Sequence, residues 1–287
     1  MNDCPTTLRL LIACPDACGL VAAVTGFIAD RGGNLLESEQ HTDREHSEFF
    51  MRVEFEESEA CRDRSAFTSA WAPLAREHLM DWSVNWSSDR KRMVILVGKQ
   101  AHCLHDLLWR WKAGELDVDI PAVISNHDTL RPMVEATGIP FHHLPIGEGG
   151  KQAQETQIRS LLRATDADFA VLARYMQILS PEMLVGWEHR ILNIHHSFLP
   201  AFMGGDPYRQ AYERGVKIIG ATSHYVTSDL DEGPIISQEV IDVGHHDSVD
   251  DLKRKGRDLE RTVLARAVRL HIEDKILIQK NKTVVFR

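Results

Sequence analysis

From residue 93 onward, short and continuous apolar runs recur between helical segments: MVILVG (93–98), PAVISN (121–126), FAVLA (169–173) and ILNIH (191–195). These runs lack the apolar and polar alternation of a strand with one solvated face, so we expect strands that are covered on both faces. Such strands, alternating with helices, form a parallel, doubly wound sheet. Ligands of these sheets bind beyond the carboxyl ends of the strands, where Asn126 and Arg174 lie.

The first 86 residues predict a smaller α/β unit. The pattern predicts the order βαββαβ, with a strand at 7–14, a helix at 20–32, a half-buried strand at 48–56, a helix at 57–80 and a strand at 81–86. The segment SSDRKR (87–92) is polar without periodic apolar positions, which is typical of a linker. We therefore expect domains at 1–86 and 93–287, the second ending in a long helix and a hairpin.

Charge and composition disfavour several classes of protein. Lys and Arg number 33 against 42 Asp and Glu, a net charge of −9, whereas nucleic-acid and anionic-membrane surfaces need clustered cations. No apolar run approaches the ~20 residues of a membrane span, and the amino terminus lacks a signal-peptide layout. The five cysteines show no Cys-x-x-Cys spacing. We expect a soluble, cytoplasmic protein with no nucleic-acid or membrane partner.

Neither a nucleotide cofactor nor a metal is expected. The first strand-to-helix junction of the larger domain reads GKQAHCLHD (98–106), with one glycine where a phosphate-binding loop needs several. No His-Glu-x-x-His spacing occurs, and neighbouring histidines on a strand point to opposite faces. The 15 histidines include three doublets, His142-His143, His195-His196 and His245-His246. We expect the first and third doublets to be loop residues.

The second doublet has a chemical context. Asn193 and His195 are two residues apart on a predicted strand end, so both point to one side while His196 points away. An amide donor beside a protonatable imidazole can stabilise a carbonyl oxygen as it becomes a tetrahedral oxyanion. The pair is therefore a candidate catalytic site.

A base that could activate water is offered by the later segment ATSHYVTSDLDEGPII (221–236). Asp229 and Asp231 lie there in a loop between apolar strands. A carboxylate in this loop could hold the imidazole charged and accept a proton from water. Spacing does not choose between the two aspartates, and a solvated acidic turn is the alternative interpretation.

Several segments in order resemble the formyltetrahydrofolate deformylases. The resemblance lies in NIHHSFLPAF (193–202), PYRQAYERGVKIIGATSHYV (207–226), LDEGPII (230–236), AHCLHDLLWRW (101–111), AVISNHDTLR (122–131) and VLARYMQILSPE (171–182). Residues 15–43 and 49–55 resemble the ACT domain at the amino terminus of that family. The resemblance implies a ferredoxin-like ACT domain followed by a Rossmann-like formyltransferase domain. It also implies hydrolysis of 10-formyltetrahydrofolate to formate and tetrahydrofolate, supplying formate for purine synthesis.

The resemblance also assigns roles. The catalytic Asn, His and Asp of the family correspond to Asn193, His195 and Asp231, which leaves Asp229 as a turn residue. No cofactor is implied, because the folate is the substrate. The main-chain groups that hold the pterin ring in the family correspond to Met176, Gln177, Leu179, Val226, Thr227, Ser228, Asp229 and Leu230.

Other functions share this fold, among them glycinamide ribonucleotide and methionyl-tRNA formyltransferases. The ribonucleotide transferase carries a Gly-Ser-Asn loop for the acceptor phosphate, where this chain reads GKQAHCL (98–104). That difference, together with the ACT-like half, favours water as the nucleophile. The alternatives are a transferase with an unidentified acceptor and an amino-acid-responsive regulator whose catalytic half has decayed.

ACT domains commonly pair and bind amino acids at their interface, so the resemblance implies a homo-oligomer with a small-molecule effector. Gly19 and Asn34 flank the first predicted helix and are the candidate regulatory positions. Three residues depart from the family pattern: Gly98 where Ser or Thr is common, Asp206 where a basic residue is common, and Arg209 where His is common. These departures bear on affinity or specificity more than on the chemistry.

Overall fold

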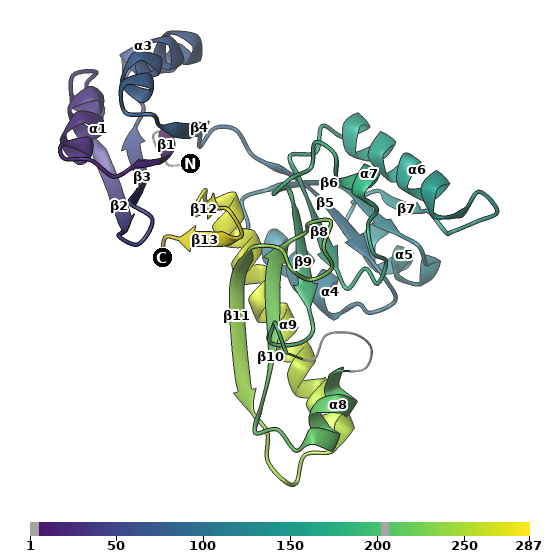
Figure 1. The fold of residues 1–287 in the computed structure, drawn as a ribbon. Helices are drawn as coiled ribbons and strands as arrows, with labels where there is room; N and C mark the ends of the chain where they lie inside the picture. The colour runs from purple at the N-terminus through teal and green to yellow at the C-terminus, as the bar shows by residue number, and fades with distance from the viewer. Residues whose placement is uncertain (1–5, 202–206) are drawn as a thin grey trace. The chain divides into compact units, whose positions relative to one another are not determined.

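The computed structural model describes residues 6–201 and 207–287, and the chain divides into two compact units (Figure 1). The first unit comprises Met1–Arg90 together with Glu273–Gln279 and Thr283–Arg287, and the second comprises Lys91–Ile272 with Lys280–Lys282. The described part of the chain contains no helix that is long and apolar enough to cross a membrane.

The first unit contains a four-stranded antiparallel sheet in the order β2-β3-β1-β4. Its elements are β1 (Thr7–Pro15), α1 (Leu20–Ala29), β2 (Leu35–Asp43), β3 (Glu48–Glu56), α2 (Glu59–Arg62), α3 (Arg64–Glu77) and β4 (Asp81–Trp86). The helices α1 and α3 pack on one face of the sheet around a core that includes Trp71. The expected βαββαβ fold is confirmed.

The helix expected at 57–80 is divided in two at Asp63. This residue has extended backbone angles, φ −78° and ψ 101°, and its carboxylate accepts a hydrogen bond from the Ala66 amide. An aspartate in that position satisfies a free amide of the first turn and so begins a new helix. The expected helix is therefore a short turn, α2, followed by α3.

The strand β3 is buried on both faces, so the prediction of a half-buried strand was wrong. Arg52 and Phe50, on the face that alternates away from the core, are both 1% exposed. Arg52 donates hydrogen bonds to the carbonyls of Glu273 and Asp274, each at 3.1 Å, and pairs with Glu54 at 2.7 Å. The C-terminal segment, which we assigned by sequence to the larger domain, covers this face.

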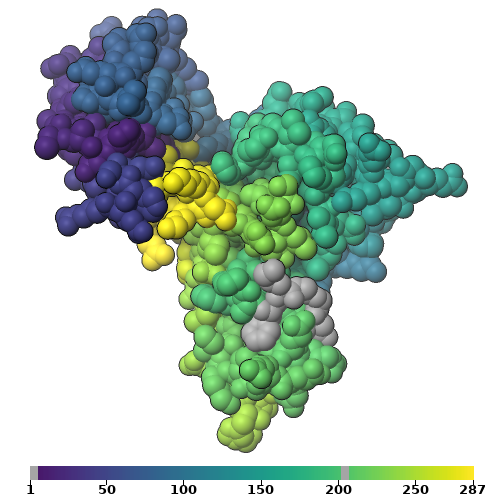
Figure 2. All heavy atoms as spheres, viewed as in Figure 1, coloured from purple at the N-terminus to yellow at the C-terminus, as the bar shows by residue number. Residues whose placement is uncertain are grey.

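The covering segment carries the hairpin of β12 (Ile276–Gln279) and β13 (Lys282–Val285). In Figure 2 the yellow carboxyl end lies against the purple and blue surface of the amino-terminal residues. Phe286 is 5% exposed. An alternating strand sequence cannot reveal this burial, because the covering residues lie more than 200 positions further along the chain.

The second unit contains a seven-stranded sheet in the order β11-β10-β9-β8-β5-β6-β7. Its strands are β5 (Arg92–Val97), β6 (Asp119–Ser125), β7 (Phe141–His143), β8 (Phe169–Ala173), β9 (Ile191–His195), β10 (Ile218–Tyr225) and β11 (Ile235–Asp242). The first five run parallel, four of them as expected, whereas β10 is antiparallel to both of its neighbours. The other parallel strand, β7, was not predicted, and it contains His142 and His143, so the expectation that this doublet lies in a loop was wrong.

Helices cover both faces of this sheet (Figure 1). They are α4 (His102–Lys112), η1 (Asp128–Leu130), α5 (Arg131–Glu135), α6 (Gly150–Ala164), α7 (Pro181–Leu184), α8 (Pro207–Arg214) and α9 (Val249–Ile272). One core joins α6 and α7 to β5, β6 and β8. The long helix α9 packs against β9, β10, β11 and α4. The doubly wound fold is confirmed.

The connection order reverses between β5 and β8, which are neighbours in the sheet although β6 and β7 lie between them in sequence. In open α/β sheets such a switch point leaves a crevice at the carboxyl ends of the strands. Gly98 follows β5 and Arg174 follows β8, so both lie at this crevice. The predicted position of a binding site therefore coincides with a topological feature of the fold.

The loop between β10 and β11 folds back closely on β10. A Cβ atom at Gly233 would lie 1.8 Å from the carbonyl oxygen of Tyr225. The Tyr225 amide also donates to the carbonyl of Pro234 at 2.9 Å, closing the loop. Only glycine permits this approach, because the obstructing atom is main chain.

We expect Gly233→Ala to lower the free energy of unfolding by about 1–3 kcal/mol, since the added methyl group must displace main chain. Urea unfolding followed by circular dichroism measures this loss. Gly147→Ala is the matched control, because nothing lies within 4 Å of a Cβ atom at Gly147. Equal stability of the two variants would contradict the assigned constraint.

A partly buried histidine couples the stability of the second unit to pH. The Nδ1 atom of His271 lies 2.8 Å from the Tyr225 hydroxyl, and its ring packs 4.5 Å from that of Phe169. Burial, reinforced by the charges of Lys91 and Arg190, lowers the pKa of His271 from 6.5 to about 3. Between these values the unfolded chain binds the proton and the folded chain does not, so acid destabilises the fold.

We therefore expect wild-type stability to fall as the pH drops below 6.5, with His271 contributing roughly 1–2 kcal/mol at about pH 5. His271→Gln removes the titrating ring and should flatten this dependence, even if it lowers stability at neutral pH. Thermal unfolding of both proteins across the pH range is the measurement. Identical slopes for the two proteins would rule out His271 as the source.

Candidate functional site

A pocket of about 300 Å³ lies at the carboxyl ends of β8 and β9 and beside the loop after β10. It brings together residues that are up to 59 positions apart in sequence, from Leu172 to Asp231. All eleven residues that the sequence assigned to catalysis or substrate binding line it: Met176, Gln177, Leu179, Asn193, His195, Val226, Thr227, Ser228, Asp229, Leu230 and Asp231.

Asn193 is fixed by its neighbour across the sheet. In the antiparallel pairing of β9 with β10, Asn193 lies directly opposite His224. The Asn193 Nδ2 atom is 3.2 Å from His224 Nε2, while His224 Nδ1 lies 2.9 Å from the Tyr225 carbonyl and donates to it. This contact places the Asn193 amide nitrogen beside His224 Nε2 and so holds the side chain in one orientation at the pocket.

Asp231 bridges two imidazoles. Its carboxylate oxygens lie 3.2 Å from His195 Nδ1 and 3.6 Å from His224 Nε2. Its backbone is left-handed, with φ 58°, in the loop that Gly233 closes. Burial alone would raise the pKa of Asp231, but hydrogen bonds from His195 and His224 outweigh it and hold the pKa well below its usual range. The carboxylate is thus kept ionised.

His195 presents its other nitrogen to the pocket. The side chain is 7% exposed, and its Nε2 atom has no hydrogen-bond partner within residues 6–201 and 207–287. A buried ring nitrogen that lacks a protein partner is positioned to meet a ligand atom. With Nδ1 facing Asp231, the ring is oriented for that role.

The remaining expected residues form a wall of mixed character. Leu179 is 6% exposed, whereas Met176 and Leu230 are 64% and 55% exposed. The Thr227 hydroxyl donates to the Asp229 carbonyl at 3.0 Å, which shapes the loop from within. Apolar walls with a few convergent polar groups are typical of small-ligand sites.

The sequence did not identify His224 as part of the site. It lies within the motif ATSHYV, but its contact with Asn193 depends on the register between β9 and β10.

The sequence predicted that His196 points away from the site, but this residue lines the same pocket, and its ring lies 5.2 Å from the His195 ring. Burial, and then the charge of Arg174, lowers the pKa of His196 to about 4.

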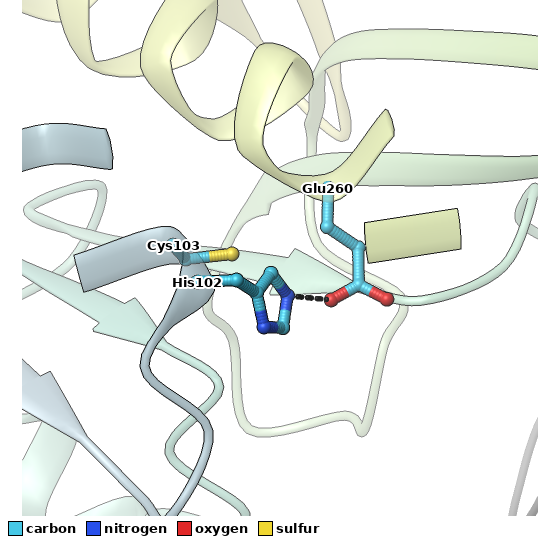
Figure 3. A group of neighbouring side chains, drawn as sticks. All are labelled: His102, Cys103 and Glu260. Carbon is cyan, nitrogen blue, oxygen red and sulfur yellow. Dashed lines mark hydrogen bonds and ion pairs between the residues drawn. The ribbon is translucent and has the colours of Figure 1, made fainter. Parts of the chain in front are cut away.

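A polar cluster of His102, Cys103 and Glu260 lies within the second unit (Figure 3). Their potential ligand atoms are all within 4.8 Å of one another, a spacing that a metal ion could use. Burial, and then the charge of Glu260, raises the pKa of Cys103 well above its usual value, whereas a metal requires the thiolate. His102 Nε2 is already 2.7 Å from Glu260. The chemistry favours a hydrogen-bonded network.

The candidate regulatory residues lie in the first unit. Gly19 caps α1 with a left-handed φ of 90°, and Asn34 donates to Glu56 at 3.1 Å. Of the family departures, Gly98 lies at the crevice and Asp206 lies outside the described residues. Arg209 is exposed on α8 and is absent from the described residues that line the pocket.

Comparison with known proteins identifies one family for the larger part of the chain and another for its amino-terminal part. Residues 91–268 match the family described as formyl transferase, and residues 8–60 match the ACT domain. The formyltetrahydrofolate deformylase of Synechocystis sp. is 51% identical over 280 residues, covering 98% of each chain. The crystal structure of a formyltetrahydrofolate deformylase from Pseudomonas syringae pv. tomato superimposes with a TM-score of 0.96 at 48% identity, covering 100% of this chain and 96% of that one.

More distant structures share part of this architecture. Glycinamide ribonucleotide transformylase 1 from Symbiobacterium toebii is 30% identical with a TM-score of 0.66, and it covers 70% of this chain and 97% of its own. The deformylases, in contrast, match nearly the whole length at higher identity. The chain belongs to the formyltetrahydrofolate deformylase family.

Proposed function

We propose that this protein hydrolyses 10-formyltetrahydrofolate to formate and tetrahydrofolate. The observation that carries the proposal is the ionised Asp231 beside His195 and Asn193, in one pocket of a chain that is 51% identical to a deformylase. The proposal includes the cytoplasmic role expected from the sequence, which is to supply formate for purine synthesis. The folate is the substrate, and the chemistry requires no cofactor.

In the proposed mechanism, the formyl oxygen faces Asn193 Nδ2 and His195 Nε2. The amide has a second N–H beyond the one directed at His224, and the charged form of the His195 ring can donate from Nε2. Two such donors stabilise the negative charge that develops on the oxygen during attack. The pterin ring lies along the main chain of Met176–Leu179 and Val226–Leu230.

Water completes the reaction with help from Asp231. The carboxylate orients the water and accepts its proton as the new C–O bond forms. The tetrahedral intermediate then collapses, the C–N bond breaks, and the departing nitrogen takes a proton. Because its pKa is held low, Asp231 is ionised when the substrate binds.

We expect Asn193→Asp and His195→Ala each to lower turnover by at least about a hundredfold, because each removes an oxyanion donor. The assay is formate release from 10-formyltetrahydrofolate with no acceptor added. His245→Ala, in an exposed loop, is the control and should retain wild-type turnover. Wild-type rates for either pocket variant would overturn the assigned roles.

The same assay separates the alternatives. A transferase would release formyl groups only when glycinamide ribonucleotide or another acceptor is present. A regulator with a decayed catalytic half would bind the folate without turnover. Formate production without an acceptor is the outcome that supports hydrolysis.

We further propose that the first unit binds an amino acid and pairs with a second copy of the chain. The matched ACT domain supports this, as do the left-handed Gly19 at the start of α1 and the Asn34 side chain that follows it. Its edge strand β2 pairs only with β3 among the described residues. A free strand edge is a surface at which another chain can add.

We expect one standard amino acid, added singly, to raise the melting temperature of the wild-type protein, since a ligand stabilises the state that binds it. In Asn34→Ala, the amino-acid concentration needed for the same rise in melting temperature should be at least about tenfold higher, because one to two hydrogen bonds are lost. Asn281→Ala, in the C-terminal hairpin turn, serves as the control. If no amino acid shifts the melting temperature, the effector proposal fails.

A further inference from the structure

Arg174 occupies an unusual position beside the pocket. It follows β8 directly, has a left-handed φ of 59°, and its side chain is 7% exposed. A Cβ atom at Gly98 would lie 2.5 Å from the Arg174 carbonyl oxygen. Glycine at position 98, one of the departures from the family pattern, thus permits the backbone conformation that places this guanidinium group in the crevice.

The guanidinium group is only partly neutralised. Its Nε atom lies 3.4 Å from Glu260, but that carboxylate also meets His102 and Tyr208, each at 2.7 Å. Within residues 6–201 and 207–287, neither Nε nor Nη1 of Arg174 has a hydrogen-bond partner, although both are buried. Buried N–H groups are nearly always paired, so those of Arg174 indicate a ligand.

The ligand must reach this group through the pocket. Arg174 lines the same pocket as His195, His196 and Asp231. A guanidinium group presents several N–H donors in a plane that matches the two oxygens of a carboxylate. The free donors of Arg174 therefore fit a small carboxylate that is formed or bound beside the catalytic residues.

The proposed reaction produces such an ion. Water and a neutral formyl group give formate, a free N–H on tetrahydrofolate and one released proton, as a C–O bond forms and the C–N bond breaks. Transfer to an amine acceptor would instead leave a neutral formamide. A hydrolase alone thus creates a negative charge next to the ionised Asp231, and like charges at close range repel.

We propose that Arg174 is a product-binding residue that receives formate as the C–N bond breaks. This inference rests on the proposed hydrolysis. The guanidinium group makes and breaks no covalent bond. It offers the new carboxylate the unpaired N–H groups of Nη1. The ion pair of Nε with Glu260, a carboxylate that also meets His102 and Tyr208, holds the group in place.

The first test is a titration of the folate-free wild-type protein with ¹³C-formate, followed by NMR line broadening. We expect saturable binding, with formamide, the neutral analogue, failing to compete. Nitrate, a planar anion without a C–H bond, tests selectivity, and weaker competition by nitrate than by formate is expected. The absence of saturable formate binding would overturn the proposal without any variant.

The second test uses Arg174→Gln, which removes the charge. We expect at least about tenfold weaker formate binding and an equal rise in the inhibition constant of formate, since a charge-assisted pair is lost. Arg254→Gln, at a side chain that is 67% exposed, is the matched control and should leave both quantities unchanged. Unchanged formate binding in a folded Arg174→Gln protein would contradict the assignment.

Replacing Arg174 also removes its ion pair with Glu260, which can prevent folding. Arg174→Lys keeps the charge but loses the planar donor pair, so formate binding should weaken by about two- to tenfold. Unchanged formate affinity in Arg174→Lys would count against the proposed carboxylate geometry.

The titration needs no turnover, so formate binding in a protein that released no formate would refute the proposed function alone. Formate release with no effect of Arg174 variants on formate affinity would refute only the product site.

Discussion

The chemistry of the pocket depends on how closely one glycine approaches the main chain. Because a Cβ atom at Gly233 would lie 1.8 Å from the Tyr225 carbonyl, the loop can fold back on β10 only with glycine there. That fold places Asp231, in a left-handed conformation, between two imidazoles. An ionised carboxylate with little exposure is costly without several partners, and the two rings supply them. The Asp231 carboxylate is thus positioned by main-chain geometry outside the pocket.

The sequence predicted those features that local periodicity determines. Continuous apolar runs indicated strands covered on both faces, and the spacing of Asn193 and His195 indicated a shared side, because alternate strand residues point the same way. Both inferences need only a few neighbouring residues. The placement of Asp231 in the same pocket came instead from a resemblance over several ordered segments, since spacing alone left Asp229 as an equal candidate.

Features that depend on register or on distant segments could not be predicted. His224 meets Asn193 only because β10 runs antiparallel to β9 in one particular register, and a shift of one residue would turn it away. Arg52 lies in a strand with alternating polar and apolar residues, and such strands usually have one solvent-exposed face. It is buried because Glu273 and Asp274 accept its hydrogen bonds. In each case the partner is more than 30 positions away or set by sheet order.

A shared fold leaves the acceptor open, since the transformylase from Symbiobacterium toebii has a TM-score of 0.66 to this chain. The difference between hydrolysis and transfer lies in the charge of the product. A site for transfer to an amine has no new anion to accommodate, so a buried guanidinium group with unpaired N–H groups would be destabilising there. Beside Asp231, the same group offsets the repulsion of the leaving carboxylate. The partly neutralised Arg174 is therefore better explained by water as the acceptor than by an amine.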